Sequence, residues 1–370
     1  MESQETFESD TSEYNVLSSL QTAPEVINST EMQQFSGLFI PLPIRYHIGP
    51  IVAIATCPRK PLLATCGGND RTLLVWNLAK RSVIASEKLT EPVNSCSFHP
   101  SGDLLAVGTS EKLLLYSLTF DSLVLRKKWE NSCTCVSFSN GGHLLAFATG
   151  ALIIKVISTY SARTVTSLRG HNLSVKSITW APNDAFFISS GLDGNVFMWS
   201  SRSWDRESEV CLPSQCISAL LNVSEVSDNS SPSYDILVAT SNNTIYYLDL
   251  SSTSTSSSRS GRSGITQDEK MDDSKINNLP KLKIDRSLRL KLKLTSIALP
   301  VHFSLIFGDT KGNLQVIPNP LPPRDEEKPF DIGTKVAVHT GAVHCIIPSS
   351  DGQTLFTASE DGSIMIFYVV

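Results

Sequence analysis

The chain has 370 residues, 41% of them apolar, and a mean hydropathy close to zero, so it carries enough apolar material for a large core. A total of 31 Lys and Arg against 36 Asp and Glu gives a formal net charge of −5, which argues against a dedicated nucleic-acid-binding protein. No apolar run reaches the roughly 18 residues of a membrane-spanning helix, and no secretory signal is recognisable, so we expect a soluble intracellular protein with reduced cysteines.

Residues 1–36 differ in composition from the rest of the chain. They contain no Lys or Arg, and their acidic residues are Glu2, Glu5, Glu8, Asp10, Glu13, Glu25 and Glu31. A polar, acidic segment with few core-forming side chains cannot bury enough surface to fold, so we predict a disordered acidic tail. The segment 38–46 that follows has the composition of a β-strand but precedes the first repeat.

A unit of three short strands recurs from residue 47 onward. It is clearest at 170–199, where a Gly-His pair opens the unit and Asp193-Gly194 marks a hairpin between apolar, β-branched runs. Clear copies begin at His47, Pro92, Cys133 and His339, and weaker copies begin at Cys216 and Leu294. Without 251–280, the seven units average about 42 residues, which is the period of four-stranded propeller blades.

These repeats predict an all-β fold in which residues 37–370 form a single seven-bladed β-propeller, since the sequence shows no convincing amphipathic helix. The last unit ends at its third strand, so we predict that strand 38–46 completes the final blade and closes the ring. Residues 251–280 begin with a Ser/Thr run, and this low-complexity composition predicts a disordered Ser-rich insertion.

Four side chains of the clearest unit can form a structural hydrogen-bond relay: His171, Ser189, Asp193 and Trp199. A histidine beside a Gly turn can donate to an aspartate in the hairpin and so fix one loop against the next. A catalytic Ser–His–Asp arrangement is the alternative. Part of the same spacing recurs at His47/Asp70/Trp76 and at His339/Asp361. Because catalytic sets rarely repeat in each structural unit, we favour the structural interpretation and predict no catalytic residue.

The cysteine spacing and the glycine pattern indicate no cofactor. Cys133 and Cys135 lie two residues apart, on one face of a strand, and we interpret them as buried thiols. Cys211 and Cys216 lack a second Cys or His pair at zinc-finger spacing, so a zinc site is not expected. Neither common glycine-rich phosphate-binding motif occurs, and we predict no metal, no cofactor and no small-molecule substrate.

Basic and apolar side chains alternate along residues 281–294. The basic members of this stripe are Lys281, Lys283, Arg286, Arg289, Lys291 and Lys293. Alternation of this kind predicts a strand with one solvent-exposed, positively charged face. Such a strand is either an outer blade strand, whose charges prevent pairing with other chains, or a docking stripe for an acidic partner such as a tubulin tail.

The ordered Gly-His, Asp-Gly and Trp positions resemble those of WD-repeat propellers. Several stretches are also similar to the second propeller of the cilia- and flagella-associated protein 57 family, and these are 47–72, 138–144, 168–172 and 357–363. The resemblance covers about residues 45–370. The resemblance implies two propellers followed by a long coiled coil, whereas from this sequence we expect one propeller and no heptad region.

The resemblance implies a non-enzymatic, protein-binding scaffold of the cilium or flagellum axoneme, linked to assembly or regulation of inner dynein arms. Its expected partners are axonemal or dynein-regulatory proteins, with tubulin as a further candidate, and neither nucleic acid nor membrane is expected. From the predicted topology we place partner binding beside the inter-strand hairpins, at Asn69, Arg71 and Lys112.

Two other functions are open to a propeller of this kind. One is an adaptor outside the cilium, such as a ubiquitin-ligase substrate receptor, although Trp204-Asp205-Arg206 lacks the spacer of the Trp-Asp-x-Arg string that such receptors present. The other is an enzyme with its site in the central channel. The predicted innermost strands are mostly apolar or small, with Lys176 and His344 as exceptions, so we do not expect an enzyme.

Overall fold

The structure is a computed structural model that describes residues 41–224, 233–251, 281–299, 305–317, 335–349, 352 and 354–368. Within these residues every helix or strand is a β-strand, and all of them belong to one compact unit, Gly37–Val370. The predicted acidic tail 1–36 and residues 252–280 of the predicted insertion lie outside the described residues.

The strands form seven antiparallel four-stranded sheets, which we number as blades 1 to 7 and give from the innermost strand outward. Blade 1 contains β2 (Ile51–Thr56), β3 (Leu62–Gly67), β4 (Thr72–Asn77) and β5 (Ser82–Lys88). Blade 2 contains β6 (Val93–Phe98), β7 (Leu104–Thr109), β8 (Leu113–Leu118) and β9 (Leu123–Trp129). Blade 3 contains β10 (Cys133–Phe138), β11 (Leu144–Thr149), β12 (Ile153–Ser158) and β13 (Thr164–Arg169).

The remaining four blades complete the ring. Blade 4 contains β14 (Val175–Trp180), β15 (Phe186–Gly191), β16 (Asn195–Ser200) and β17 (Arg206–Cys211). Blade 5 contains β18 (Cys216–Ser224), β19 (Ser233–Thr240), β20 (Thr244–Ser251) and β21 (Lys281–Arg289). Blade 6 contains β22 (Leu294–Ala298), β23 (Leu305–Asp309), β24 (Asn313–Ile317) and β25 (Lys335–Ala337). Blade 7 contains β26 (Val343–Pro348), β27 (Thr354–Ser359), β28 (Ser363–Tyr368) and β1 (Pro41–Arg45).

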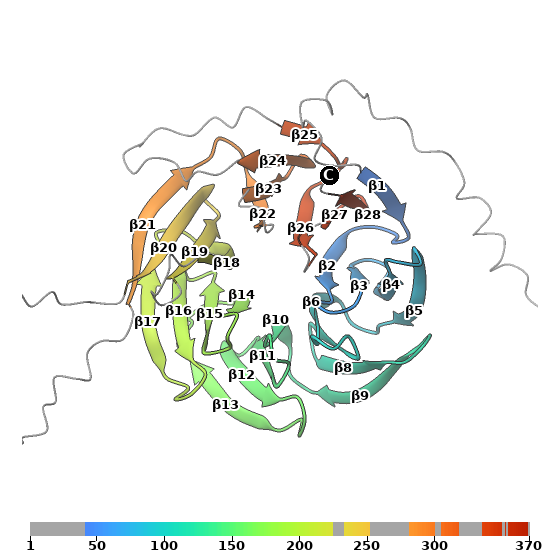
Figure 1. The fold of residues 1–370 in the computed structure, drawn as a ribbon, viewed down its shortest axis with the longest axis horizontal. Coiled ribbons are helices and arrows are strands. Elements are labelled where there is room, and N and C mark those ends of the chain that lie inside the picture. Colours follow the sequence, from blue (N-terminus) through green and yellow to red (C-terminus); the bar gives the residue numbers. More distant parts are fainter. Residues whose placement is uncertain are drawn as a thin grey trace, which may run out of the picture. The chain divides into compact units, whose positions relative to one another are not determined.

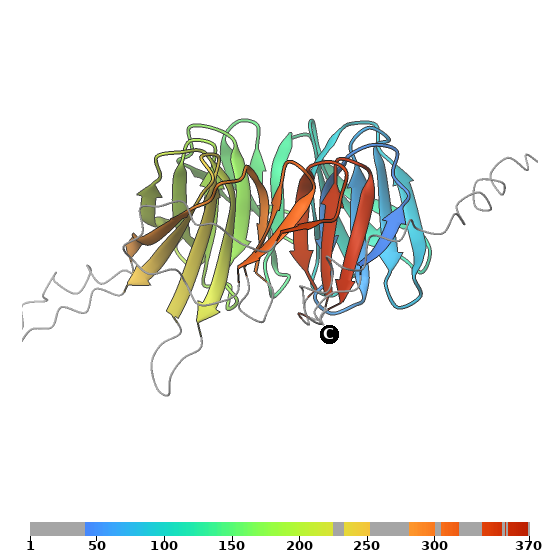
Figure 2. The same cartoon turned by 90° about the horizontal axis from the view of Figure 1, so that it is seen from above.

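The blades stand around a central axis, with their innermost strands facing it (Figure 1). Each innermost strand contacts the innermost strand of the next blade, and β26 of blade 7 contacts β2 of blade 1, so the ring is closed. The turns between strands gather at the two rims of the ring (Figure 2). The prediction of an all-β, seven-bladed propeller is confirmed.

The core of the molecule lies between neighbouring blades. Every residue of β3, β7 and β15 is buried, because both faces of a blade's second strand pack against adjacent sheets. One apolar cluster joins Ala64 and Val75 of blade 1 to Leu105 and Tyr116 of blade 2, and further clusters join other neighbouring blades. The outer strand β9 is exposed along most of its length.

Blade 7 combines the two ends of the described chain. Strand β1 pairs antiparallel with β28, in a register that runs from Pro41 opposite Phe367 to Arg45 opposite Ser363. The outer edge of β28 is therefore covered by a strand more than three hundred residues away in sequence.

A β-bulge near the start of the innermost strand recurs in every blade. The register shifts between the first and third residues of each innermost strand, which leaves one extra residue there. The extra residues are Val52, Asn94, Thr134, Lys176, Ile217, Thr295 and His344. Asn94 Nδ2 donates to Cys133 O at 2.9 Å, so a bulged residue also links one blade to the next.

Candidate functional site

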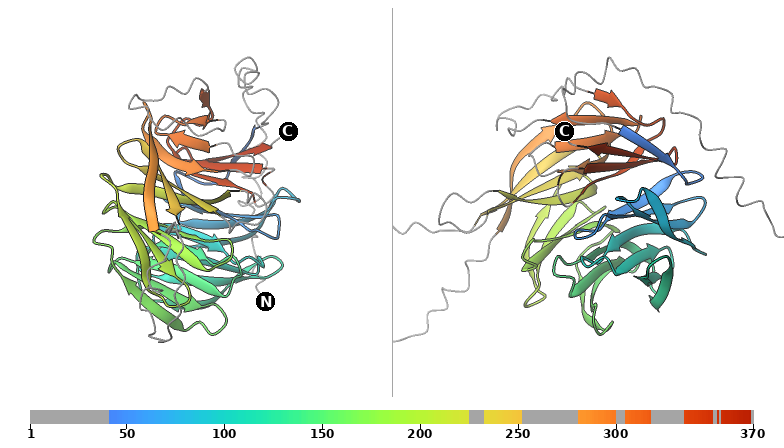
Figure 3. Two further views of the ribbon diagram at one scale, coloured as in Figure 1. Left: turned by 60° about the vertical axis from the view of Figure 1, so that its left-hand side comes forward. Right: turned by 45° about the vertical axis from the view of Figure 1, so that its right-hand side comes forward.

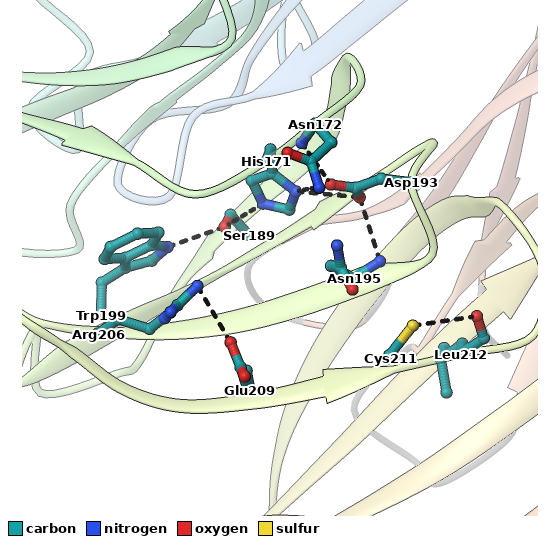
Figure 4. Close-up of polar contacts among 10 residues, drawn as sticks. All are labelled: His171, Asn172, Ser189, Asp193, Asn195, Trp199, Arg206, Glu209, Cys211 and Leu212. Carbon is teal, nitrogen blue, oxygen red and sulfur yellow. Dashed lines mark hydrogen bonds and ion pairs between the residues drawn. The ribbon is translucent and has the colours of Figure 1, made fainter.

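Blade 4 contains a buried chain of polar side chains (Figure 4). Trp199 Nε1 donates to Ser189 Oγ at 2.9 Å, and Ser189 Oγ lies 2.8 Å from His171 Nε2. His171 Nδ1 lies 3.1 Å from both carboxylate oxygens of Asp193. The structure therefore brings together all four residues in which the sequence indicates a relay.

The protonation of this blade 4 relay follows from its surroundings. Burial lowers the pKa of His171, so its imidazole is neutral near pH 7. Burial alone would raise the pKa of Asp193, but hydrogen bonds from the Asn172 N–H, from His171 and from the Asn195 N–H lower it overall. An ionised Asp193 accepts from His171 Nδ1–H, and His171 Nε2 then accepts the proton of the Ser189 hydroxyl.

This geometry does not suit nucleophilic catalysis. Ser189 is 0% exposed, and its hydroxyl oxygen already lies within hydrogen-bond distance of both Trp199 and His171. A catalytic serine must reach a substrate carbonyl, which a fully enclosed hydroxyl cannot do. What the arrangement can do is tie the loop before β14 to the β15–β16 hairpin.

The same arrangement occurs in blade 1. His47 Nδ1 lies 3.0 Å from Asp70 Oδ2, and His47 Nε2 lies 2.8 Å from Thr65 Oγ1. Trp76 Nε1 donates to Thr65 Oγ1 at 3.0 Å, so a threonine takes the place that a serine has in blade 4. Burial lowers the pKa of His47, as it does for the blade 4 histidine.

Blade 7 contains a version of the relay that lacks the tryptophan. His339 Nε2 lies 2.8 Å from Thr357 Oγ1, and His339 Nδ1 lies 2.8 Å from Ser363 Oγ. Ser363 Oγ in turn donates to Asp361 Oδ1 at 2.5 Å, while the His339–Asp361 pair itself is longer, at 3.4 Å. Phe367 follows Asp361 by the same six residues as the tryptophans of blades 1 and 4, so no indole donor completes this relay.

Blade 2 replaces the relay by an ion pair that the sequence analysis missed. Lys112 Nζ donates to Glu91 Oε1 at 2.7 Å, and Thr109 Oγ1 donates to Glu91 Oε2 at 3.1 Å. The hydrogen bond from Lys112 lowers the pKa of Glu91. Glu91 precedes the innermost strand by two residues, whereas the relay histidines precede theirs by four, so a search for a histidine at fixed spacing overlooks it.

Of the residues predicted to bind partners, two flank the same short connection between blades 1 and 2. Arg71 Nη1 donates to Thr90 O at 2.7 Å, and Lys112 is paired with the next residue, Glu91. Arg71 is exposed and has a φ of 52° at its hairpin. Asn69 is also exposed, and its side chain lies close to Gly49 in the connection from blade 7 to blade 1.

The predicted basic stripe begins on β21, the outer strand of blade 5. This strand is drawn in orange in Figure 3. On β21 the side chains of Lys281, Lys283 and Arg289 are exposed, while those of Leu282 and Leu288 are buried against the blade. The register places Lys281 and Lys283 on one face of the sheet and Arg289 on the other, because the bulge between Ile284 and Arg286 inverts the alternation. The single positively charged face that the alternation predicts is therefore not formed, and the three exposed cations lie along the outer edge of the blade.

The other three cations of the predicted stripe, Arg286, Lys291 and Lys293, do not belong to this exposed edge. A bulge at Asp285 shifts the register of β21, and Arg286, with a side chain only 19% exposed, is paired with Asp285 at 2.8 Å. The strand ends at Arg289, so Lys291 and Lys293 lie in the connection to β22. Asn243 organises this connection, because its carbonyl and side-chain oxygens accept the N–H groups of Leu290 and Leu294.

All eight cysteines are free thiols. Cys133 and Cys135 are buried, and burial raises the pKa of Cys135 to about 11. Cys216 is buried, with its pKa raised by burial to about 12, whereas Cys211 is exposed.

Among the described residues, no group of three or more His, Cys, Asp or Glu side chains is positioned to hold a metal ion. The described part of the chain also contains no helix that could cross a membrane.

Comparison with known proteins places these features in context. The model of the WD domain, G-beta repeat, matches residues 43–77, 83–117, 162–200 and 333–367. Cilia- and flagella-associated protein 57 of Mus musculus is 28% identical over 356 residues, which are 96% of this chain and 25% of that protein. Cilia- and flagella-associated protein 57 C of Tetrahymena thermophila is 26% identical over 166 residues, covering 41% of this chain and 13% of the relative.

A shorter similarity involves a second group of proteins. Echinoderm microtubule-associated protein-like 2 of Mus musculus is 33% identical over 66 residues, which are 18% of this chain and 10% of that protein. The chain thus spans about a quarter of the length of the mouse cilia- and flagella-associated relative, and less of the others.

Proposed function

This chain is a seven-bladed WD-repeat propeller similar to cilia- and flagella-associated protein 57, and from this premise we propose that it is a non-enzymatic scaffold of the cilium or flagellum axoneme. The observation that carries the proposal is the similarity to the mouse protein over 96% of this chain. Within that scaffold role we propose a part in the assembly or regulation of inner dynein arms. Its partners are other axonemal proteins.

The chemistry of the channel wall supports a role without catalysis. Apart from cysteines, the innermost strands carry two ionisable side chains within the described residues, Lys176 and His344. They belong to blades 4 and 7, which are not neighbours in the ring. Acid–base catalysis needs groups that converge on one substrate, and the histidines of the relays are buried in contacts of their own.

Two exposed regions are the proposed contact surfaces. The first consists of the exposed Asn69 and Arg71 with the half-buried Lys112, which is paired with Glu91, near the hairpins of blades 1 and 2. The second is the basic edge of β21, formed by Lys281, Lys283 and Arg289, for which we propose an acidic partner such as a tubulin tail. Support for the second comes from the similarity to a protein that is named as microtubule-associated.

Affinity purification of the tagged full chain from ciliated cells, after mild crosslinking, tests this proposal. We expect axonemal proteins, dynein subunits among them, to co-purify. Recovery of ubiquitin-ligase subunits without axonemal proteins would contradict it and would favour the alternative function of an adaptor outside the cilium.

A triple variant, Lys281→Glu, Lys283→Glu and Arg289→Glu, tests the basic edge in the same experiment. We expect it to reduce recovery of tubulin or of another acidic partner severalfold, since the favourable charge is reversed. The matched control reverses Arg126 and Lys127, two exposed cations on the outer strand of blade 2, and should leave recovery unchanged. Equal recovery with both variants would remove the basic edge from the proposal.

A further inference from the structure

A cavity of about 650 Å³ opens between blade 7 and blade 1. Its walls are mainly apolar and include Leu63 and Trp76 of blade 1 together with Phe356 and Ile366 of blade 7. Tyr46, in the connection from β1 to β2, contributes a side of the cavity and packs edge-to-face on Trp76, with ring centroids 4.8 Å apart. Tyr46 is 50% exposed, so an apolar surface extends from the cavity to the solvent.

The rim of this blade 7/1 cavity is positively charged. Arg59 and Lys60 reach it from the β2–β3 turn, and Arg81 reaches it from the β4–β5 turn. Among the described residues that line it there is no Asp or Glu. Lys60 pairs with Asp103 of blade 2, whereas Arg59 and Arg81 form no ion pair within the described part of the chain.

We propose that this cavity binds an acidic peptide segment of another protein, with one bulky apolar side chain held between the two blades. The cavity has mainly apolar walls and a volume in the range of sites that enclose a small molecule, so it can hold a bulky side chain together with parts of the residues beside it. Carboxylates on either side of that side chain would meet Arg59 and Arg81, whose charge is opposite and which form no ion pair within the described residues.

The apolar walls and the cationic rim together explain why the peptide needs both a bulky apolar side chain and acidic residues beside it. A buried aromatic or aliphatic side chain supplies most of the binding free energy at a protein interface, while charges at its rim mainly steer the encounter and select the partner. An uncharged apolar peptide would leave the cations at the rim without complementary charge. A purely acidic peptide would leave the apolar walls empty.

A synthetic probe tests this inference with the full chain. The probe is a fluorescein-labelled heptapeptide with one phenylalanine between two runs of three glutamates, and binding is followed by fluorescence anisotropy. We expect saturable binding that weakens about tenfold or more when alanine replaces phenylalanine, because the buried apolar area is lost. Binding should also weaken as salt increases.

The matched variant removes the two rim charges that form no ion pair in the described residues and leaves Lys60 in place. Arg59→Gln changes an exposed turn residue, and Arg81→Asn suits a position with a φ of 52°, which asparagine tolerates. We expect the double variant to bind the probe about tenfold more weakly and with less salt dependence, while Arg126→Gln on β9 binds it as the unchanged chain does.

Equal affinity for the phenylalanine and alanine probes would overturn the inference, and so would unchanged affinity in the double variant. The inference rests on the proposed scaffold role but fails separately from it. If the chain co-purifies with axonemal proteins and the probe does not bind, the scaffold role stands and this site does not.

Discussion

At the scale of single residues, four blades fix the loop before their innermost strand by a side-chain contact in the same place, but with different residue types. Blades 1 and 4 join a histidine, a hydroxyl, an aspartate and a tryptophan, blade 7 lacks the tryptophan, and blade 2 uses a Glu–Lys ion pair. Each of them ties the loop before an innermost strand to a hairpin of the same blade. In blade 2 a carboxylate replaces the loop imidazole and an ammonium replaces the hairpin carboxylate. Side chains that can be exchanged in this way are suited to holding loops in place, since proton transfer needs matched groups.

Ser189→Ala is expected to lower the free energy of unfolding by roughly 1–3 kcal/mol, because it leaves the buried Trp199 donor and the His171 acceptor without their shared partner. Equilibrium unfolding in urea measures this change. Ser189→Thr should lose less, since Thr65 holds the same contacts in blade 1. If the alanine and threonine variants were equally stable, the hydroxyl would not be what holds the relay together.

Acid should destabilise the protein in two stages, the first of which begins below about pH 6.5. Burial lowers the pKa of His47, His99 and His171, so the unfolded chain takes up protons that the folded chain does not. Stability is therefore full above that pH and decreases below it. The second stage lies below about pH 4, where Asp70 and Asp193, whose pKa values are lowered by hydrogen bonds, become protonated.

Thermal unfolding between pH 7.5 and 5 at constant ionic strength measures the first stage. The midpoint temperature should decrease steadily toward pH 5. A midpoint that rises or stays constant toward pH 5 would show that the buried imidazoles do not control acid stability.

At the scale of elements, the second-to-third-strand hairpins are shaped by left-handed residues. Gly194 has a φ of 78°, and a Cβ atom there would lie 2.6 Å from Leu212 O. Gly362 has the same φ and would meet Gly49 O at 2.8 Å. Blade 5 uses Asn243 with a φ of 63°, so the backbone conformation is shared even where glycine is not.

Gly194→Ala is expected to lower the free energy of unfolding by about 1–2 kcal/mol or more, because it combines a strained backbone with a close contact to Leu212 O. Gly194→Asn should recover only part of this loss, since asparagine tolerates the φ but keeps the Cβ atom. Denaturant unfolding separates the two causes. Full recovery by asparagine would mean that the contact with Leu212 contributes little.

The sequence predicted the blades well because each carries its own local signals, such as Asp193-Gly194 and the buried run of β15. It could not predict where β21 ends. Alternation continues past Arg289, but the end of the strand depends on a bulge at Asp285 and on hydrogen bonds to Asn243, more than forty residues earlier. Contacts between residues far apart in the chain form only on folding, so they leave no pattern in the local sequence that would predict the end of the strand.

At the scale of the whole molecule, the ring depends on β1. Removing residues 1–45 would remove this strand and expose the edge of β28. We expect the midpoint of thermal unfolding to decrease by several degrees or more, with self-association detectable by gel filtration. Removing residues 1–36 leaves β1 in place and serves as the control. Equal midpoints for the two truncations would show that the ring does not need this strand for its stability.

The ring has no converging catalytic groups on its described innermost strands, a basic outer edge on blade 5 and a cationic cavity between blades 7 and 1. The basic edge and the cationic cavity are the two surfaces to which we assign partner binding in our proposals. They lie on one rigid frame, because neighbouring blades share apolar clusters. The similarity to the mouse protein extends over 96% of this chain and over 25% of that relative.

The measurement that tests the scaffold role most directly is fractionation of cilia from cells that express the tagged full chain. The membranes are removed with detergent, and the axonemes are then washed with increasing salt. Our account predicts that the tag stays with the salt-washed axoneme and that crosslinks from that fraction reach neighbouring axonemal proteins. Complete release of the tag with the soluble pool would contradict the axonemal role.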